Sequence, residues 1–188
     1  MSVREIVTAG HPVLRERARE ISPDELQSSE IQALIDDLID TMRFAGGAGL
    51  AANQIAEPVR VAVVEVTPEH PRYPYKPPIP LTVIVNATIE PIGSDTIEIN
   101  EGCLSVPGLR GVLARWAAVR VRYLDRRGEA QVGVWRGLSA GTFQHEVDHL
   151  DGILFLDRVS DPRTFMTWES FDRFHRDSFV ARVAELPR

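Results

Sequence analysis

The chain has 188 residues, a formal net charge of −6 at pH 7, 44% hydrophobic residues and 26% charged residues. These values are typical of one globular domain that buries a core without disulfides. The negative charge argues against a dedicated nucleic-acid binder, because such domains usually present a basic surface. We therefore expect one domain over residues 1–188 that makes no direct contact with nucleic acid.

The N-terminal stretch MSVREIVTAGHPVLRERARE has charges where a signal peptide would have its apolar run. No stretch approaches the length of a membrane span. These features predict a cytoplasmic protein without membrane contact. The chain has one cysteine, Cys103, so no internal disulfide can form. A lone thiol of this kind is a small buried side chain, a nucleophile or a metal ligand.

The first predicted element is an amphipathic helix over residues 23–45. Ser22 is its expected N-cap, Pro23 occupies the first helical position and Glu25 the third, and glycines at 46–47 end it. Its apolar residues fall at steps of three and four: Ile31, Leu34, Ile35, Leu38, Ile39 and Met42.

Two segments rich in β-branched residues, Val59–Val66 and Leu81–Ile89, are predicted to be strands. The residues between them, 67–80, include six prolines and predict a surface loop. Ala117–Leu124 alternates arginine with apolar residues and predicts a strand, which a turn connects to a partner at Ala130–Val134.

Two further helices are expected, over about 139–150 and 162–184. The aromatic residues Phe165, Trp168, Phe171, Phe174 and Phe179 approximate one face of the second helix. Strands cluster in the middle of the chain and do not alternate with helices. This order predicts an α+β fold, with a mostly antiparallel sheet packed around the central helix and with helices at both ends.

The central helix carries the motif His145-Glu146-Val147-Asp148-His149. Residues four apart on a helix lie one above the other, so both imidazoles can reach one ion. Glu146 is turned by about 100° from His145 and can approach a ligand on that ion without binding it. An ion with an open position lowers the pKa of bound water to about 7. The motif therefore predicts a metal-dependent hydrolase with Glu146 as the general base.

A third protein ligand is required, and spacing alone leaves two candidates. In one protease arrangement the third ligand is a histidine six residues past the second. Phe155 stands at that position, so this arrangement is excluded. Glu169, on the last predicted helix, would complete the site of a small zinc peptidase. Cys103 lies in a polar segment, EGCLS at 101–105, which is an unusual setting for a core cysteine. A structural metal module is a third reading, but it has no use for Glu146 as a base.

Three segments resemble, in the same order, the three motifs of the peptide deformylase family. They are GAGLAANQ at 47–54, EGCLS at 101–105 and QHEVDH at 144–149. The resemblance extends from about residue 12 to about residue 158. We therefore expect a catalytic core over 12–158 and a C-terminal helical extension over 159–188.

The resemblance implies that Cys103, His145 and His149 hold one divalent ion. In the family this ion is naturally ferrous iron, although zinc, nickel or cobalt would also suit a thiolate and two imidazoles. It further implies an enzyme that removes the N-formyl group from the N-terminal methionine of newly made polypeptides, near the ribosome, and releases formate.

The same resemblance implies the catalytic roles. Glu146 would take a proton from water and deliver it to the leaving amine. The side-chain amide of Gln54 and the backbone N–H of Leu104 would stabilise the oxyanion, as preorganised donors do. Gly49 would let the backbone approach the substrate closely, because it has no Cβ. Gly102 is expected to line the same substrate site.

Asp148 and two arginines form a separate prediction. Asp148 lies on the histidine helix in surroundings expected to be buried, so its carboxylate needs a partner. Arg115 is the favoured partner. Arg110 is then left near the cleft, where it could bind substrate carbonyls or the far end of the peptide.

The sequence departs from the family pattern at Ala48 and Gly141, which are smaller than the residues usual there. The departure predicts a loose side-chain pocket, in which formyl peptides starting with phenylalanine are cleaved within about tenfold of methionine peptides. The competing possibility is that Phe143, Leu138 or a residue of the last helix refills the space.

Overall fold

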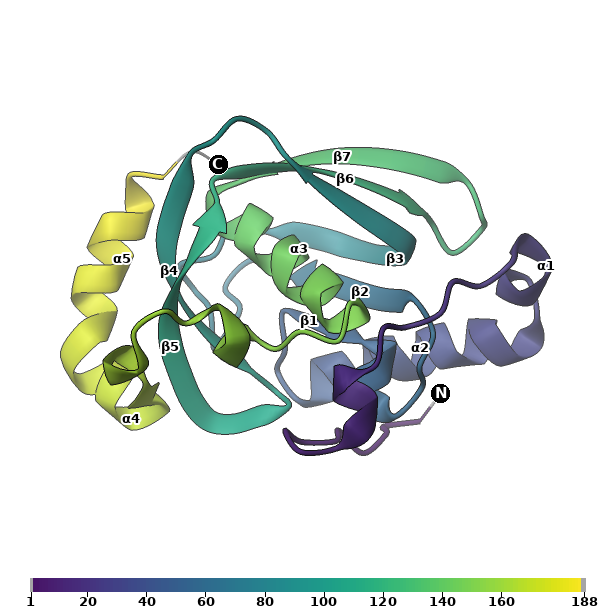
Figure 1. Ribbon diagram of the computed structural model, residues 1–188, viewed down its shortest axis with the longest axis horizontal. Coiled ribbons are helices and arrows are strands. Elements are labelled where there is room, and N and C mark those ends of the chain that lie inside the picture. The colour runs from purple at the N-terminus through teal and green to yellow at the C-terminus, as the bar shows by residue number, and fades with distance from the viewer. Residues whose placement is uncertain (1, 187–188) are drawn as a thin grey trace.

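The computed structural model describes residues 2–186, and two sheets organise it (Figure 1). One sheet has the strand order β1-β2-β3-β6-β7 and the other β4-β5-β8. The strands are β1 (Gly49–Ala51), β2 (Val61–Val66), β3 (Ile79–Pro91), β4 (Thr96–Cys103), β5 (Val106–Trp116), β6 (Ala118–Leu124), β7 (Ala130–Arg136) and β8 (Met166–Thr167). All pairs within these two sheets are antiparallel, which confirms the predicted α+β class.

The helices surround and separate these sheets. The α-helices are α1 (Pro23–Leu26), α2 (Ser29–Phe44), α3 (Gly137–Leu150), α4 (Trp168–Ser170) and α5 (Arg176–Ala184). Short 3-10 segments cover Pro12–Arg15, Ala52–Ile55, Phe155–Arg158 and Pro162–Thr164, and a π-helical turn covers Phe171–His175. No helix within residues 2–186 is long and apolar enough to cross a membrane.

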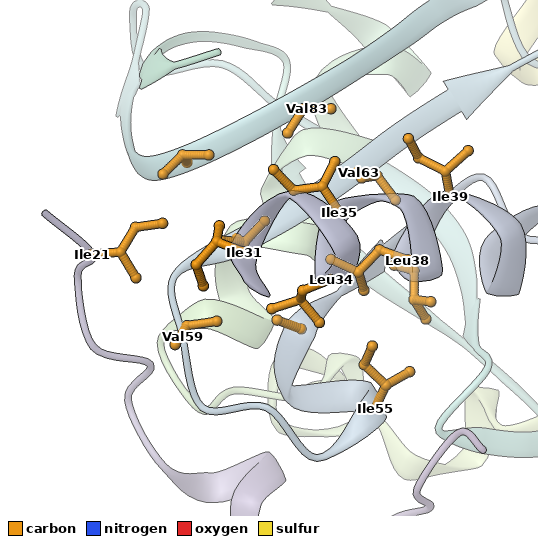
Figure 2. Packing of buried hydrophobic residues seen from close by; sticks show 14 of the residues in the cluster. Ile21, Ile31, Leu34, Ile35, Leu38, Ile39, Ile55, Val59, Val63 and Val83 are labelled. Carbon is orange, nitrogen blue, oxygen red and sulfur yellow. The ribbon is translucent and has the colours of Figure 1, made fainter. Parts of the chain in front are cut away.

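The strand β2 is buried on both faces of the five-stranded sheet, which explains why its residues are apolar except for Glu65. Successive side chains of a strand point to opposite faces. Val61 and Val63 pack with α2, whereas Ala62 and Val64 belong to the cluster that includes α3. Figure 2 shows the α2 side of this core, where Ile35, Leu38 and Ile39 lie near Val63 and Val83. The sheet is thus the middle layer between α2 and α3.

The helix predicted over 23–45 is interrupted. Its start is confirmed, because the Glu25 N–H donates to Ser22 Oγ (3.2 Å) and the Ser22 N–H donates to Glu25 Oε2 (2.8 Å). Ser28 then caps a second start by accepting from the Ile31 N–H at 3.2 Å. A serine that bonds to the backbone in this way favours a helix end over a helix interior.

The sequence prediction assigned no strand to residues 96–116, where β4 and β5 form a long hairpin. The two strands pair Ile99 with Leu113 and Gly102 with Arg110. Polar residues and glycines interrupt their alternation, so the pattern is weak in the sequence. This omission concerns the sheet that carries Cys103. Figure 1 shows α3 in the middle of the molecule, with β4 and β5 on one side and β3, β6 and β7 on another.

The proline-rich segment 67–80 has no regular structure before β3 begins, but it is not confined to the surface. His70 is buried, and its Nε2 lies 3.3 Å from the backbone oxygen of Gly47. Tyr73 stacks on His70 with ring centroids 5.1 Å apart. Tyr75 packs edge-on against Phe179 of α5. The prediction of a surface loop is therefore wrong for these residues, because aromatic packing draws them inward.

The C-terminal segment is not the single helix predicted over 162–184. After the 3-10 turn it adds β8 to β5, and helix begins only at α4. Phe171 and Phe179 are buried as expected, whereas Phe174 is 64% exposed and does not share their face. Residues 1, 187 and 188, which the predicted domain includes, lie outside the described part. The division into a core and an extension stays a prediction.

Candidate active site

The fold brings Cys103, His145 and His149 together. One donor atom of each lies within 4.8 Å of the others. The two histidines are one turn apart on α3, with ring centroids separated by 5.0 Å. Cys103 ends β4, and its Sγ is 3.2 Å from His149 Nε2. The rival ligand Glu169 lies exposed on α4 and is not part of this cluster.

The surroundings of these donors fit a divalent transition-metal ion. His145 Nδ1 is 2.8 Å from Glu101 Oε2, so Nε2 is the ring nitrogen that remains free to bind. The Cys103 sulfur accepts from Gln54 Nε2 at 3.5 Å and from the Ser105 N–H at 3.4 Å. A sulfur that accepts hydrogen bonds in this way suits a metal ligand, because cysteine binds metals as the thiolate.

Glu101 is a positioning residue that the sequence prediction missed. Its two carboxylate oxygens accept from Arg115 Nε (2.8 Å) and Nη2 (2.9 Å). Burial opposes its ionisation, but Arg115 and His145 outweigh burial and hold the pKa of Glu101 far below its usual range. Residues two apart on a strand share a face. A strand prediction for β4 would therefore have placed Glu101 beside Cys103.

The predicted pair between Asp148 and Arg115 is confirmed. Arg115 Nη1 lies 2.5 Å from Asp148 Oδ2, and Arg158 Nη2 adds a second cation 2.7 Å from Oδ1. Arg115 thus connects Asp148 on α3 to Glu101 on β4. The two acidic groups need this cation because both are buried.

Glu146 lines a cavity together with Cys103 and His145, but it is not part of the cluster of metal donors. Its side chain is buried, and burial raises the pKa of its carboxyl to about 7. Within the described part of the chain, its Oε2 has no hydrogen-bond partner. A carboxyl group with these properties can exchange protons near neutral pH.

Gly49 on β1 makes room for this carboxylate. A Cβ placed on Gly49 would lie 2.6 Å from Glu146 Cδ. The close contact at this position is therefore with the general-base candidate Glu146, in addition to any approach by a substrate.

We expect Gly49→Ala to lower kcat by about 10²-fold with unchanged metal content, because displacing a reacting group by about 1 Å costs this much. Steady-state kinetics and elemental analysis of the purified variant measure both. Gly133→Ala is the matched control, since its Cβ would meet Trp135 Nε1 at 2.7 Å on β7. It should lower thermal stability and leave kcat unchanged. Equal kcat for Gly49→Ala and wild type would show that Glu146 does not need its present position.

The amide of Gln54 is fixed beside the donor cluster. Its Oε1 accepts from the Ala51 N–H at 2.9 Å, and its Nε2 donates to Ser105 Oγ at 3.1 Å as well as to the Cys103 sulfur. Both amide hydrogens are thus engaged in this structure. Leu104 follows β4 in a turn and lines the same cavity.

The C-terminal end of α3 is held by two residues with no assigned role in the sequence prediction. Asn53 Nδ2 donates to the backbone oxygen of His149 at 2.5 Å. Arg60 is buried and donates to the backbone oxygen of Leu150 (3.1 Å) and to Asp151 Oδ1 (2.8 Å). Cations and N–H donors suit a helix C-terminus, where carbonyls lack partners. These contacts fix the turn that carries His149.

The cavity beside Glu146 contains the residues expected to contact substrate. These residues are Ala48, Gly49, Gly102, Arg110 and Gly141. The space left by Gly141 is occupied, because a Cβ there would lie 2.6 Å from Ile99 Cδ1. Phe179 of α5 lines the cavity too, whereas Phe143 stacks on Trp135. The structural premise of a loose pocket is therefore not met at Gly141.

Arg110 is more constrained than expected. It is 1% exposed, and it donates from Nε to Asn100 Oδ1 and from Nη2 to the Asn100 backbone oxygen. Its guanidinium lies over the rings of Trp168 (3.9 Å) and Phe171 (4.2 Å). Residues of the C-terminal segment thus fix one wall of the cavity, which the sequence did not indicate.

The site combines two histidines one turn apart with a cysteine from a neighbouring strand, and a buried carboxylate lies next to them. This arrangement is that of a metal-dependent hydrolase. Residues 3–165 match the family model described as polypeptide deformylase. The chain belongs to this family, whose members remove the N-formyl group from new polypeptides.

Individual relatives agree with this assignment. The chain is 44% identical to peptide deformylase 1 of Prochlorococcus marinus (strain MIT 9313), over 88% of this chain and 85% of that protein. It is similar to the Met-Ala-Ser-bound class I type b peptide deformylase of Acinetobacter baumannii, with a TM-score of 0.80 and 39% identity over 84% of this chain and 99% of that one. The chain is also similar to the peptide deformylase of Synechococcus elongatus in complex with actinonin. The TM-score is 0.75 and the identity 32%, over 96% of this chain and 88% of that one.

Proposed function

We propose that Cys103, His145 and His149 hold the metal ion of this deformylase and that Glu146 is its general base. The observation that carries the proposal is the convergence of these three donors beside a buried carboxylate that is not one of them. Ferrous iron is the proposed native ion. Zinc, nickel and cobalt also accept a thiolate and two imidazoles. A divalent ion held by these three residues would supply Lewis-acid chemistry, which lowers the pKa of a water molecule and polarises a carbonyl group.

The residues of the chain supply the proton transfers. Glu146 takes a proton from the attacking water and delivers it to the amine as the formyl C–N bond breaks. Burial raises the pKa of its carboxyl and so favours taking up the proton. The products are formate and a peptide with a free amino group.

Oxyanion stabilisation is proposed for Gln54 and for the backbone N–H of Leu104. Gln54 would redirect one amide hydrogen from Ser105 Oγ to the formyl oxygen as that oxygen gains charge. One such donor typically contributes a factor of about 10²–10³. Gly49 and Gly102 line the path of the peptide backbone, and Ala48 and Gly141 line the side-chain pocket. Arg110 is proposed to face the substrate with its remaining N–H groups.

The proposed substrates are N-formylated nascent polypeptides near the ribosome, and the proposed location of the enzyme is the cytoplasm. Formate release from formyl-Met-Ala-Ser by the iron-loaded protein tests the assignment, with unblocked Met-Ala-Ser as the control. We expect formate from the first peptide only. Cleavage of the Met-Ala bond without formate release would contradict the proposal and favour a peptidase.

A further inference from the structure

Lys76 is the only lysine of the chain, and it reaches the active-site cavity from the proline-rich segment. Its Nζ donates a hydrogen bond to Thr142 Oγ1 on α3 at 2.9 Å. It also lies 4.9 Å from the ring centroid of Tyr73. The cavity that it lines is the one that contains His145 and Glu146. A cation is thus placed in a substrate pocket without an assigned task.

The amine has hydrogen-bonding capacity to spare. An ammonium group has three donors, and within the described residues its hydrogen-bond acceptor is Thr142 Oγ1. Thr142 uses its own hydroxyl hydrogen on the Leu138 backbone oxygen at 3.1 Å. Burial lowers the pKa of Lys76 to about 8, against the attraction of Glu101 and Glu146.

The position of Thr142 locates this donor relative to the reacting groups. Thr142 is three residues before His145, which is about 4.5 Å along the helix axis. The cavity is also lined by the apolar residues Ile99, Leu138, Gly141 and Phe179, and by Tyr75, which packs edge-on against Phe179. A mostly apolar wall with a few placed polar groups fixes the orientation of a ligand that is apolar along its length and polar at its end.

We propose that Lys76 is a specificity-determining residue that donates a hydrogen bond to a neutral acceptor at the end of the substrate's first side chain. The pocket would then accept oxidised methionine, whose sulfoxide oxygen is a strong acceptor, in addition to methionine. This inference rests on the proposed function.

The test compares kcat/KM for three formyl tripeptides that share the sequence X-Ala-Ser. In these peptides X is methionine, methionine sulfoxide or norleucine, which has similar length and no acceptor. For the wild type we expect the sulfoxide peptide to exceed the norleucine peptide by about 10–100-fold, the value of a hydrogen bond to a charged group. Lys76→Met should remove most of this ratio and leave the norleucine peptide nearly unaffected.

Two further variants separate the donor from general packing. Lys76→Gln keeps an N–H donor without the charge and should give an intermediate ratio, because charge-assisted hydrogen bonds are about twice as strong. It also serves if Lys76→Met is too unstable to assay. Arg72→Met is the matched control, since Arg72 lies on the same segment over Trp168 and does not line the cavity. Its ratio should equal that of the wild type.

Several outcomes would overturn the inference. A wild-type ratio near one would show that Lys76 does not contact the acceptor. An equal loss for all three peptides in Lys76→Met would assign Lys76 to the catalytic carboxylates instead. The same loss of ratio in Arg72→Met would assign the effect to the packing of the segment. Failure of the wild type to release formate from the methionine peptide would contradict the proposed function itself.

Discussion

Replacing Cys103 by serine is expected to leave the purified protein without a stoichiometric metal ion and without measurable deformylation. A thiolate binds iron, zinc, nickel and cobalt far better than a hydroxyl group does. The remaining two imidazoles, His145 and His149, would hold an ion only weakly. Elemental analysis after dialysis, together with formate release from formyl-Met-Ala-Ser, measures both effects.

Glu169→Gln is the control for this experiment. Glu169 is exposed on α4, outside the cluster of donors, so this variant should keep both the ion and the activity. A protein that loses its ion through Glu169→Gln and keeps it through Cys103→Ser would have the ligand set of the rival zinc peptidase.

Replacing Glu146 by alanine is expected to lower turnover by at least about 10²-fold, the usual scale for a positioned proton acceptor. The ion should remain at wild-type stoichiometry, because the three donors do not include this carboxylate. Burial favours the neutral form of Glu146, so removing it also removes a costly buried group. The variant should therefore fold, and its thermal midpoint should be close to that of the wild type.

Glu146→Gln separates proton transfer from the shape of the site. The amide has the size of the carboxylate but cannot take a proton, so both variants should lose activity to a similar extent. If Glu146→Ala loses its ion together with its activity, Glu146 is a ligand and the proposed roles are wrong.

Much of the site could be predicted because its chemistry is local in the sequence. His145, Glu146 and His149 lie within five residues, and helical geometry alone places them together. The partnership of Arg115 and Asp148 could be predicted from charge, since a buried carboxylate requires a cation. The strands β2 and β3 are equally local, because their β-branched runs need no distant partner to be recognised.

The remainder depends on contacts between distant segments. Ile99 fills the space beside Gly141 from β4, whose alternation is lost in the polar residues and the glycine at 100–102. Arg110 is held by Asn100 and Trp168, and the tryptophan comes from a segment without any motif. The inward turn of His70 likewise depends on Gly47, which local propensity cannot reveal. These are tertiary effects, and a single sequence contains no direct signal for them.

The metal donors come from different layers of the molecule. Cys103 ends a strand of the three-stranded sheet, whereas His145 and His149 belong to the helix that packs on the five-stranded sheet. A bound ion would therefore act as a cross-link between these layers, and binding would be linked to folding. Removing it should loosen the junction of the layers before either sheet opens. Amide hydrogen exchange would then rise first near Cys103, while the layer between α2 and α3 keeps its protection.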